Sequence, residues 1–257
     1  MDSTTAAAPL PQVTLFHFKG AWGLFDVCPF CTEVEAYLLL AEIPFTAVRL
    51  SVYDLQKVPN GRVPLIEHEG KQVSEAQAIL EHLQAASDIG LDAALSPLQR
   101  AHGRAFRTML AESLYWAIIQ SRWFEPTVWT QYRRLLYDEL SPEHRDVVPG
   151  MAAEAVRREM LGHGMGRHPP ERIYQIALGH LGAVSEQLSA GPFLLGEHVS
   201  SFDAAAYAFL SHVLSVPYAT PLKQSARQLP NLEAYLARMK QLLATCTGSA
   251  GDGKKHE

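Results

Sequence analysis

The sequence predicts a two-domain fold, with a small α/β domain over residues 12–87 and an all-helical domain over residues 96–245. Three observations predict it. Strand-like and helix-like patterns alternate only in the first part of the chain, a relaxed stretch around residues 86–97 indicates a linker, and every later periodic segment has helical spacing. A chain of 257 residues is long enough to fold as two compact domains.

The first domain begins with a strand-like run over residues 13–18, and a helix follows from about Phe30 to Ala41. Apolar residues recur there at helical spacing, and Ile43-Pro44 closes the helix. Residues 45–50 then alternate as a strand does. The first three elements are therefore predicted to be a strand, a helix and a strand.

Two short strands are predicted on either side of the Glu69-Gly70 turn, entered through Val63-Pro64. Ser74 is expected to cap the next helix, with Gln77 completing a capping box. The order strand, helix, strand, strand, strand, helix, with a Cys-x-x-Cys motif after the first strand, predicts a thioredoxin-like domain.

The second domain carries no strand signal, and its helices are predicted from apolar spacing, prolines and caps. Ser200 and Asp203 are expected to cap one of them. The terminal stretches 1–11 and 246–257 are expected to be disordered. The predicted helices cover residues 98–122, a segment opening at Glu125-Pro126, residues 152–160 and 170–188, a segment opening at Ser200, and residues 232–243.

The tetrapeptide Cys28-Pro29-Phe30-Cys31 lies between the first strand and the first helix. A cysteine at a helix start faces unsatisfied N–H groups and the positive end of the helix dipole, which favours its thiolate. A Cys28 thiolate could attack a disulfide or an electrophilic carbon. Cys31 could resolve a mixed disulfide or simply pack under the helix, and both interpretations stay open.

Composition limits the partners. A net charge of −5 gives no reason to expect nucleic acid or an anionic membrane. Zinc would need a second ligand pair, and Cys246 is the only other cysteine, so we expect no metal. Three cysteines, the absence of a signal-peptide pattern at the start and the lack of a stretch of transmembrane length predict a cytoplasmic protein with no membrane partner.

Several separated motifs resemble the glutathione transferase superfamily, and specifically its Fax/metaxin-like branch. Residues 22–38, around Cys-Pro-Phe-Cys, are similar to a Ser-Pro-Phe-Cys motif that precedes a Val-Glu-Thr-Tyr-Leu helix in that branch. The stretch 162–171 and the run from Phe193 to Ala204 also resemble it. The resemblance spans about residues 13–243 and implies a thioredoxin-like domain joined to a transferase-type helical domain.

The resemblance implies glutathione as co-substrate, bound along the first domain. Cys28 stands where the superfamily places its catalytic thiol or hydroxyl, and Cys31 would be the second thiol. Val63 precedes a proline that the superfamily holds in cis, and its backbone would pair with the cysteinyl part of glutathione. Glu75 matches the acidic member of the γ-glutamyl site, but Ala76 replaces the usual Ser. The expected glutathione-binding residues are Phe30, Arg62, Val63, Pro64, Glu75 and Ala76, and Trp22, Tyr115 and Trp116 are expected to line the substrate pocket.

The function that we expect is glutathione-dependent thiol–disulfide exchange or transfer at Cys28. One alternative is conjugation of glutathione to a small electrophile near Tyr115 and Trp116. Another is a non-catalytic interaction module, since metaxin-type relatives act in protein import at a membrane; the polar C-terminal end, without a hydrophobic anchor, weighs against it. A homodimer is expected because two-fold dimers are the norm of the superfamily.

Overall fold

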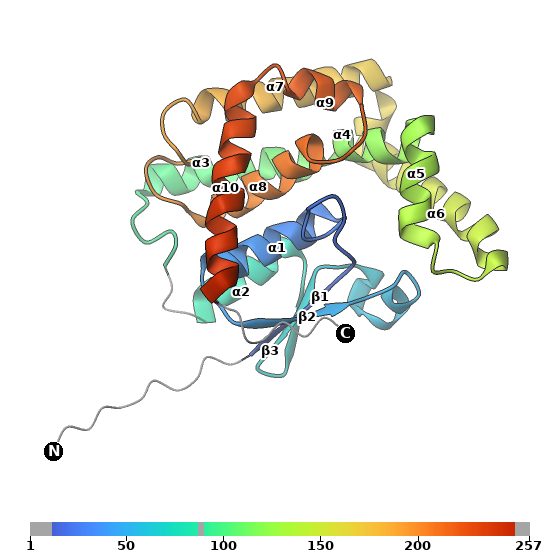
Figure 1. Ribbon diagram of the computed structural model, residues 1–257, viewed down its shortest axis with the longest axis horizontal. Coiled ribbons are helices and arrows are strands. Elements are labelled where there is room, and N and C mark those ends of the chain that lie inside the picture. Colours follow the sequence, from blue (N-terminus) through green and yellow to red (C-terminus); the bar gives the residue numbers. More distant parts are fainter. Residues whose placement is uncertain (1–11, 87–89, 250–257) are drawn as a thin grey trace.

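The computed structural model describes residues 12–86 and 90–249. Figure 1 shows a sheet at one side of the molecule, with α1 lying between the sheet and the helices of the second domain. The elements of the first domain are β1 (Val13–His17), α1 (Pro29–Leu40), β2 (Phe45–Arg49), two 3-10 turns (Asp54–Lys57 and Pro59–Gly61), β3 (Leu65–His68), β4 (Lys71–Ser74) and α2 (Ala76–Ala86).

The four strands form one sheet in the order β2-β1-β3-β4. β1 and β2 are parallel, whereas β1 with β3 and β3 with β4 are antiparallel. The parallel pair needs a crossover, which α1 supplies. This topology confirms the predicted thioredoxin-like fold.

The capping box predicted at Ser74 and Gln77 is wrong. Ser74 pairs with Leu65 and ends β4, so the helix begins two residues later at Ala76. Glu75 links the strand to the helix with a φ of 72°, in the left-handed region. Gln77 donates to Glu81 at 2.6 Å, one turn further along α2.

The second domain is helical, as predicted. One helical run extends from Pro97 to Phe124, with two π-helical stretches where the sequence predicts a regular helix. The short helix α9 is not predicted. The elements are α3 (Pro97–Thr108), the π-helical stretch Met109–Leu114, α4 (Tyr115–Ile119), the π-helical stretch Gln120–Phe124, α5 (Pro126–Tyr137), α6 (Pro142–His163), the 3-10 turn Met165–Arg167, α7 (Pro170–Gln187), α8 (Ser201–Leu214), α9 (Pro221–Ala226) and α10 (Pro230–Ser249).

Two boundaries differ from the sequence expectation. The helix expected over residues 152–160 begins already at Pro142 and keeps Pro149 in its interior. The last helix runs through Ser249, beyond the domain end expected at residue 245. The rest of the predicted C-terminal tail, and the tail over residues 1–11, lie outside the described residues.

The cap predicted at Ser200 is confirmed. Ser200 and Asp203 form a capping box at the start of α8. The fully buried Asp203 also accepts from the Leu194 N–H at 2.8 Å and from the Tyr235 hydroxyl at 3.0 Å. This carboxylate ties α8 to α10 and to the preceding loop.

One large apolar core runs through both domains, because α1 packs along α8. Tyr37 and Leu38 of α1 and Phe209 of α8 have no exposed surface. An ion pair crosses the same boundary: the buried Glu33 carboxylate accepts from Arg107 Nε of α3 at 2.6 Å. The two domains therefore form a continuous packed unit.

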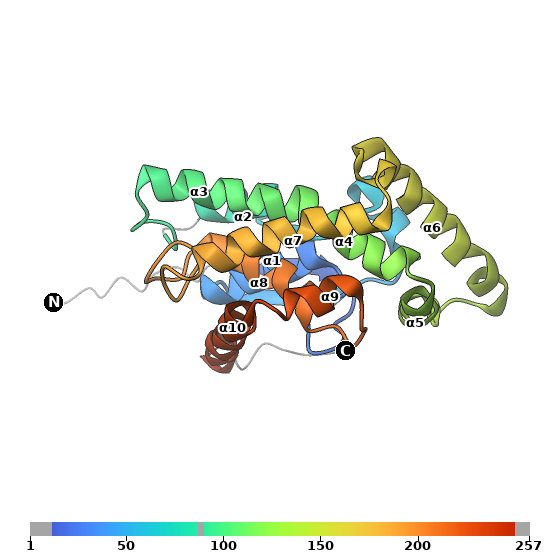
Figure 2. The same cartoon turned by 90° about the horizontal axis from the view of Figure 1, so that it is seen from above.

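Two helices extend away from the rest of the molecule, although Met160 near the end of α6 belongs to the core. In both views α5 and α6 project from one side of the molecule (Figures 1 and 2). None of the helices within residues 12–86 and 90–249 has an apolar stretch long enough to span a bilayer.

Candidate functional site

The sheet brings the predicted site segments to one of its ends. Phe16, at the end of β1, pairs with Leu65 of β3, and Leu65 pairs with Ser74 of β4. The segment that follows β1 leads to Cys28, Pro64 directly precedes Leu65, and Glu75 directly follows Ser74. The cysteine motif, the Val63-Pro64 peptide and the start of α2 therefore lie at the same end of the sheet. The Val63-Pro64 peptide is cis, as predicted.

Cys28 and Cys31 occupy different environments. Cys28 is the N-cap residue of α1, has extended backbone and is half-buried, and its side chain makes no capping hydrogen bond. Cys31 lies in the first turn of α1 with no exposed surface. Burial raises the pKa of the Cys31 thiol well above its usual range. Of the two thiols, Cys28 is the one that a ligand can reach.

A buried carboxylate holds the backbone of Cys28. Asp26 has no exposed surface, and its Oδ1 accepts from the Cys28 N–H at 2.6 Å. Its Oδ2 lies 2.9 Å from His17 Nδ1 at the end of β1. Burial raises the pKa of Asp26, while the hydrogen bond with His17 acts in the opposite direction.

A buried arginine of the second domain reaches the same peptide group. Arg122, 2% exposed, donates from Nη1 to the Val27 carbonyl at 2.9 Å. Its Nη2 donates to His212 Nδ1 and to the His212 carbonyl, each at 2.9 Å. Among the described residues no carboxylate lies within ion-pair distance of Arg122, and its Nε has no hydrogen-bond partner.

The hydrogen bonds of Arg122 determine the tautomer of His212. An arginine can only donate, so His212 Nδ1 accepts and the ring proton sits on Nε2. Nε2 then donates to Thr32 Oγ1 at 3.0 Å, and Thr32 can donate to the Cys28 carbonyl at 3.2 Å. Burial and the Arg122 charge lower the pKa of His212 well below its usual value, which agrees with a neutral ring. A chain of hydrogen bonds, each with an assigned donor and acceptor, thus links α8 to the cysteine turn.

This neutral histidine predicts an acid-sensitive fold. Because the folded-state pKa of His212 lies below the unfolded value of about 6.5, the unfolded chain binds the extra proton, and stability falls as the pH drops below about 6.5. We expect this group to change the free energy of unfolding by about 1.4 kcal/mol per pH unit. Urea unfolding at several pH values should show a reduced slope in His212→Asn and an unchanged slope in a control, His168→Asn, at an exposed histidine. Equal slopes in His212→Asn and the parent would contradict the assignment.

An aromatic cluster covers Arg122. The guanidinium carbon lies 5.6 Å from the Trp22 ring centroid and 5.7 Å from that of Tyr132, within the range of cation–π interactions. Trp22 also meets the Tyr218 ring edge-on at 5.2 Å. Trp22 is predicted from the sequence to line the substrate pocket. Its ring packs against the Arg122 guanidinium.

The other predicted pocket residues lie on α4. Tyr115 is 5.0 Å from the Phe30 ring, and its neighbour Trp116 packs on His163 at 5.0 Å. Burial, together with the nearby Cys28, raises the pKa of Tyr115 far above its usual value, so its phenol stays protonated. The Phe30 ring is clamped between Tyr115 and Phe209 and belongs to the domain interface.

The remaining predicted residues, Arg62, Glu75 and Ala76, follow or precede strands at the same end of the sheet. Arg62 is exposed and pairs with Glu159 of α6 at 2.9 Å. Arg62 directly precedes Val63, so its backbone adjoins the cis Val63-Pro64 peptide. Glu75 is exposed, whereas Ala76 is 4% exposed at the start of α2. Cys28, the Arg62-Val63-Pro64 segment and the Glu75-Ala76 segment thus adjoin the same end of the sheet.

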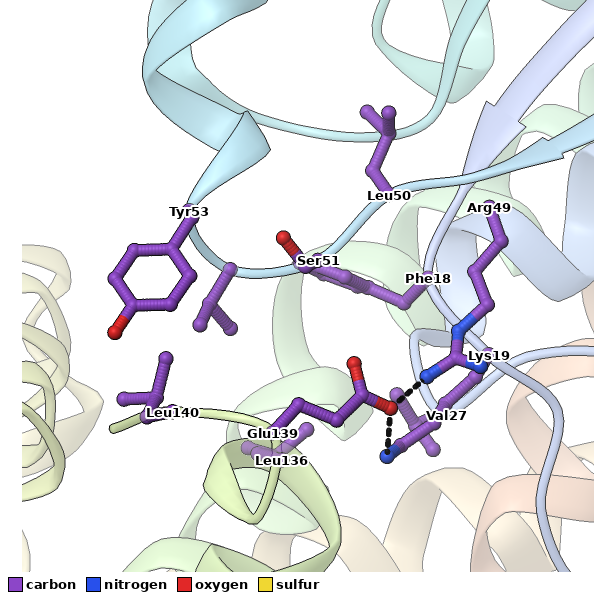
Figure 3. Close-up of a pocket in the computed structure, with 11 residues that line it drawn as sticks. Phe18, Lys19, Val27, Arg49, Leu50, Ser51, Tyr53, Leu136, Glu139 and Leu140 are labelled. Carbon is purple, nitrogen blue, oxygen red and sulfur yellow. Dashed lines mark hydrogen bonds and ion pairs between the residues drawn. The ribbon is translucent and has the colours of Figure 1, made fainter. Parts of the chain in front are cut away.

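A hollow that the sequence does not predict lies behind Val27, between the ends of β1 and β2 and the end of α5. Figure 3 shows Glu139 reaching both Arg49 and Lys19, the latter at 3.4 Å. These ion pairs attach the segment that follows α5 to the first domain. The lining residues are Phe18, Lys19, Val27, Arg49, Leu50, Ser51, Val52, Tyr53, Leu136, Glu139 and Leu140.

Sequence reasoning missed Asp26, Arg122 and His212. The available signal was weak: Asp26 is a single polar residue in an apolar stretch, and Arg122 and His212 each follow a serine within a helix-like segment. Within the part of the chain that the structure describes, no three His, Cys, Asp or Glu side chains converge as a metal site would require.

Comparison with known proteins identifies the family. Residues 29–128 match a glutathione S-transferase N-terminal domain model, and residues 177–239 match a glutathione S-transferase C-terminal domain model. The chain is 32% identical over 239 residues to isoprene-epoxide–glutathione S-transferase of Rhodococcus sp. (strain AD45), covering 90% of this chain and 98% of that protein. The chain belongs to the glutathione transferase superfamily.

Two further relatives fall in the Fax/metaxin-like branch. Failed axon connections of Drosophila melanogaster is 27% identical over 240 residues, covering 89% of this chain and 57% of that protein. Metaxin-1 of Sus scrofa is 27% identical over 252 residues, covering 94% and 74%. The chain is thus a Fax/metaxin-like member of the superfamily.

A solved structure supports the fold. The β-etherase LigF of Sphingobium sp. strain SYK-6 superposes with a TM-score of 0.64 at 18% identity, covering 92% of this chain and 99% of that one.

Proposed function

We propose that this protein is a glutathione-dependent thiol transferase in which Cys28 is the nucleophile. The observation that carries the proposal is the contrast between the two thiols of the motif. Cys28 is half-buried at the N-cap of α1, whereas Cys31 is fully buried in the first turn of that helix. A thiol at a helix N-terminus is placed for nucleophilic attack.

Glutathione would lie along the sheet edge beside Cys28. The Val63 backbone would pair with its cysteinyl part, and the N-terminus of α2 at Glu75-Ala76 would hold the γ-glutamyl carboxylate. Glu75 adopts a left-handed backbone, a conformation that non-glycine residues keep mainly where the surrounding structure requires it. Arg62, directly before Val63, offers a further cation to the ligand.

The proposed reaction has two exchange steps. The Cys28 thiolate attacks a glutathione-containing disulfide, the substrate S–S bond breaks, and the substrate leaves as a thiol after taking a proton. The thiolate of a second glutathione then attacks the Cys28–glutathione disulfide, and the S–S bond breaks to release oxidised glutathione and the Cys28 thiolate. We assign this release to glutathione because Cys31 is buried and held in its thiol form.

The proposal is tested by two parallel assays on the intact protein. One follows reduction of a small mixed disulfide by glutathione, and the other follows conjugation of glutathione to a generic aryl halide and to a small epoxide. Turnover in the first assay supports the proposal. Turnover only in the second rules it out in favour of conjugation.

Conjugation to a small epoxide is the second candidate, favoured by the 32% identical isoprene-epoxide relative. In that reaction the glutathione thiolate attacks an epoxide carbon, the C–O bond breaks, and the alkoxide takes a proton. Tyr115 keeps its phenol proton and lies near Cys28, so it is the candidate donor.

A substitution at Ala76 should strengthen glutathione binding. Ala76→Ser adds one hydroxyl donor at the start of α2, and we expect tighter binding by about three- to tenfold, or about 0.7–1.4 kcal/mol. The gain is smaller than a full charged hydrogen bond because water can already occupy the gap. Calorimetry measures the affinity, with Ala78→Ser, two residues further along α2, as the matched control. Unchanged affinity in Ala76→Ser, with measurable binding in the parent, would place the ligand elsewhere.

A non-catalytic interaction role is the third possibility, since the chain also resembles Failed axon connections and metaxin-1. Binding of glutathione without turnover in either assay would favour it. The homodimer and the cytoplasmic location stay predictions, and gel filtration with light scattering tests the former.

A further inference from the structure

The peptide group that joins Val27 to Cys28 is held at both ends by buried ionisable side chains. Its carbonyl accepts from Arg122 at 2.9 Å, and its N–H donates to Asp26 at 2.6 Å. Asp26 also contacts His17 at 2.9 Å and is completely buried. The carboxyl cannot turn away from Cys28 without losing hydrogen bonds on both of its oxygens.

The position of Asp26 gives it an electrostatic effect on Cys28. The N-terminus of α1 favours a thiolate, but a carboxylate beside the same residue opposes it. The charge of the Asp26–His17 pair depends on one proton. With that proton bound the pair is neutral, and without it the pair carries one negative charge beside the Cys28 backbone N–H.

Other groups around Cys28 hold constant charges near neutral pH. Tyr115 of α4 and Tyr132 of α5 stay protonated, because burial raises the pKa of each, to about 12 for Tyr132. Cys31 is likewise held as a thiol. Arg122 is permanently charged, Arg62 pairs with Glu159, and His212 is neutral. Among the described residues, Asp26 is the carboxyl that accepts a hydrogen bond from the Cys28 backbone.

We infer that Asp26 is a positioning residue that restrains the reactivity of Cys28, and that His17 relieves this restraint by balancing the carboxylate charge. This inference rests on the proposed role of Cys28 as nucleophile. It adds that a carboxylate two residues before the half-buried Cys28 thiol lowers the reactivity of that thiol, and that removing the carboxylate charge raises it.

The test measures alkylation of Cys28 by iodoacetamide as a function of pH, in the intact protein and without glutathione. Mass spectrometry with fragment ions distinguishes Cys28 from Cys31. Asp26→Asn keeps an acceptor for the Cys28 N–H but removes the charge. We expect alkylation at neutral pH to be about three- to tenfold faster than in the parent, with the half-maximal rate at lower pH.

His17→Gln should act in the opposite direction. Glutamine can still donate to Asp26 but cannot become charged, so the carboxylate stays unbalanced. We expect alkylation at neutral pH to be about two- to fivefold slower, with the half-maximal rate at higher pH. Loss of packing alone would move both variants in the same direction, so the opposite signs separate electrostatics from structure.

Glu69→Gln is the matched control, because it removes a carboxylate from the β3–β4 turn at the opposite end of the sheet, and it should leave the profile unchanged. Thermal melts confirm that each variant is folded, and if Asp26→Asn does not fold, the direction of the His17→Gln shift decides. An unchanged profile, or shifts of the same sign in both variants, overturns the inference. Since the assay needs no glutathione, opposite shifts without thiol-transferase turnover would refute the proposed function and leave the inference standing.

Discussion

Replacing Cys28 by serine is expected to lower thiol-transferase turnover to below about one-hundredth of the parent rate, because a serine hydroxyl is not ionised at neutral pH and cannot form a mixed disulfide. Glutathione binding should change by less than about threefold, since the proposed ligand contacts come from the Val63 backbone and the start of α2. Steady-state kinetics with a small mixed disulfide, beside calorimetry, measures both quantities.

Cys246→Ser is the matched control for this experiment. It makes the same chemical change on α10, away from the cysteine turn, and should keep the parent rate. Trapping offers an independent check, because a mixed disulfide with glutathione should form at Cys28 in the parent and not in Cys28→Ser. Retained thiol exchange in Cys28→Ser would contradict Cys28 as the nucleophile. Retained conjugation with lost thiol exchange would mean that the two reactions use different groups.

Arg122→Ala is expected to reduce the free energy of unfolding by about 3–5 kcal/mol. The substitution leaves the carbonyls of Val27 and His212 without their buried donor and opens a cavity beneath Trp22. It also breaks the link between the helical domain and the cysteine turn. Urea unfolding measures the loss, and alkylation of Cys28 reports whether the turn has loosened.

Two further variants serve as a control and as an intermediate case for the loss of stability in Arg122→Ala. Arg133→Ala removes an exposed arginine from α5 and should change stability by less than about 0.5 kcal/mol. Arg122→Lys keeps the charge but cannot reach all three acceptors, so its loss should fall between the two. A loss below about 1 kcal/mol in Arg122→Ala would mean that the network does not hold the two domains together.

The elements predicted correctly are those whose determinants lie close together in the chain. The cap of α8 needs only Ser200 and Asp203, three residues apart, and it forms as predicted. The break after α6 follows from Gly164, which takes a φ of 103° that other residues rarely adopt. Local patterns of this kind are readable because the interaction partners are neighbours in sequence.

The cap predicted at Ser74 shows where local reasoning fails. Ser74 and Gln77 have the spacing of a capping box, but pairing with Leu65 keeps Ser74 in β4. The backbone then turns at Glu75, and the helix begins at Ala76. Pairing with Leu65, nine residues earlier in the chain, keeps Ser74 out of the helix. The spacing of Ser74 and Gln77 contains no information about that partner.

By itself, the sequence determined the order of the elements, the thioredoxin-like sheet, the helical second domain and the location of the cysteine motif at a helix start. These depend on periodicity, caps and turn residues, which act over a few positions. Only the tertiary structure decided what surrounds Cys28. Asp26, Arg122 and His212 come from distant parts of the chain, and they meet because α1 packs against α8 and the Arg122 side chain crosses to Val27. Burial then determines their protonation, since desolvation and neighbouring charges exist only in the folded chain.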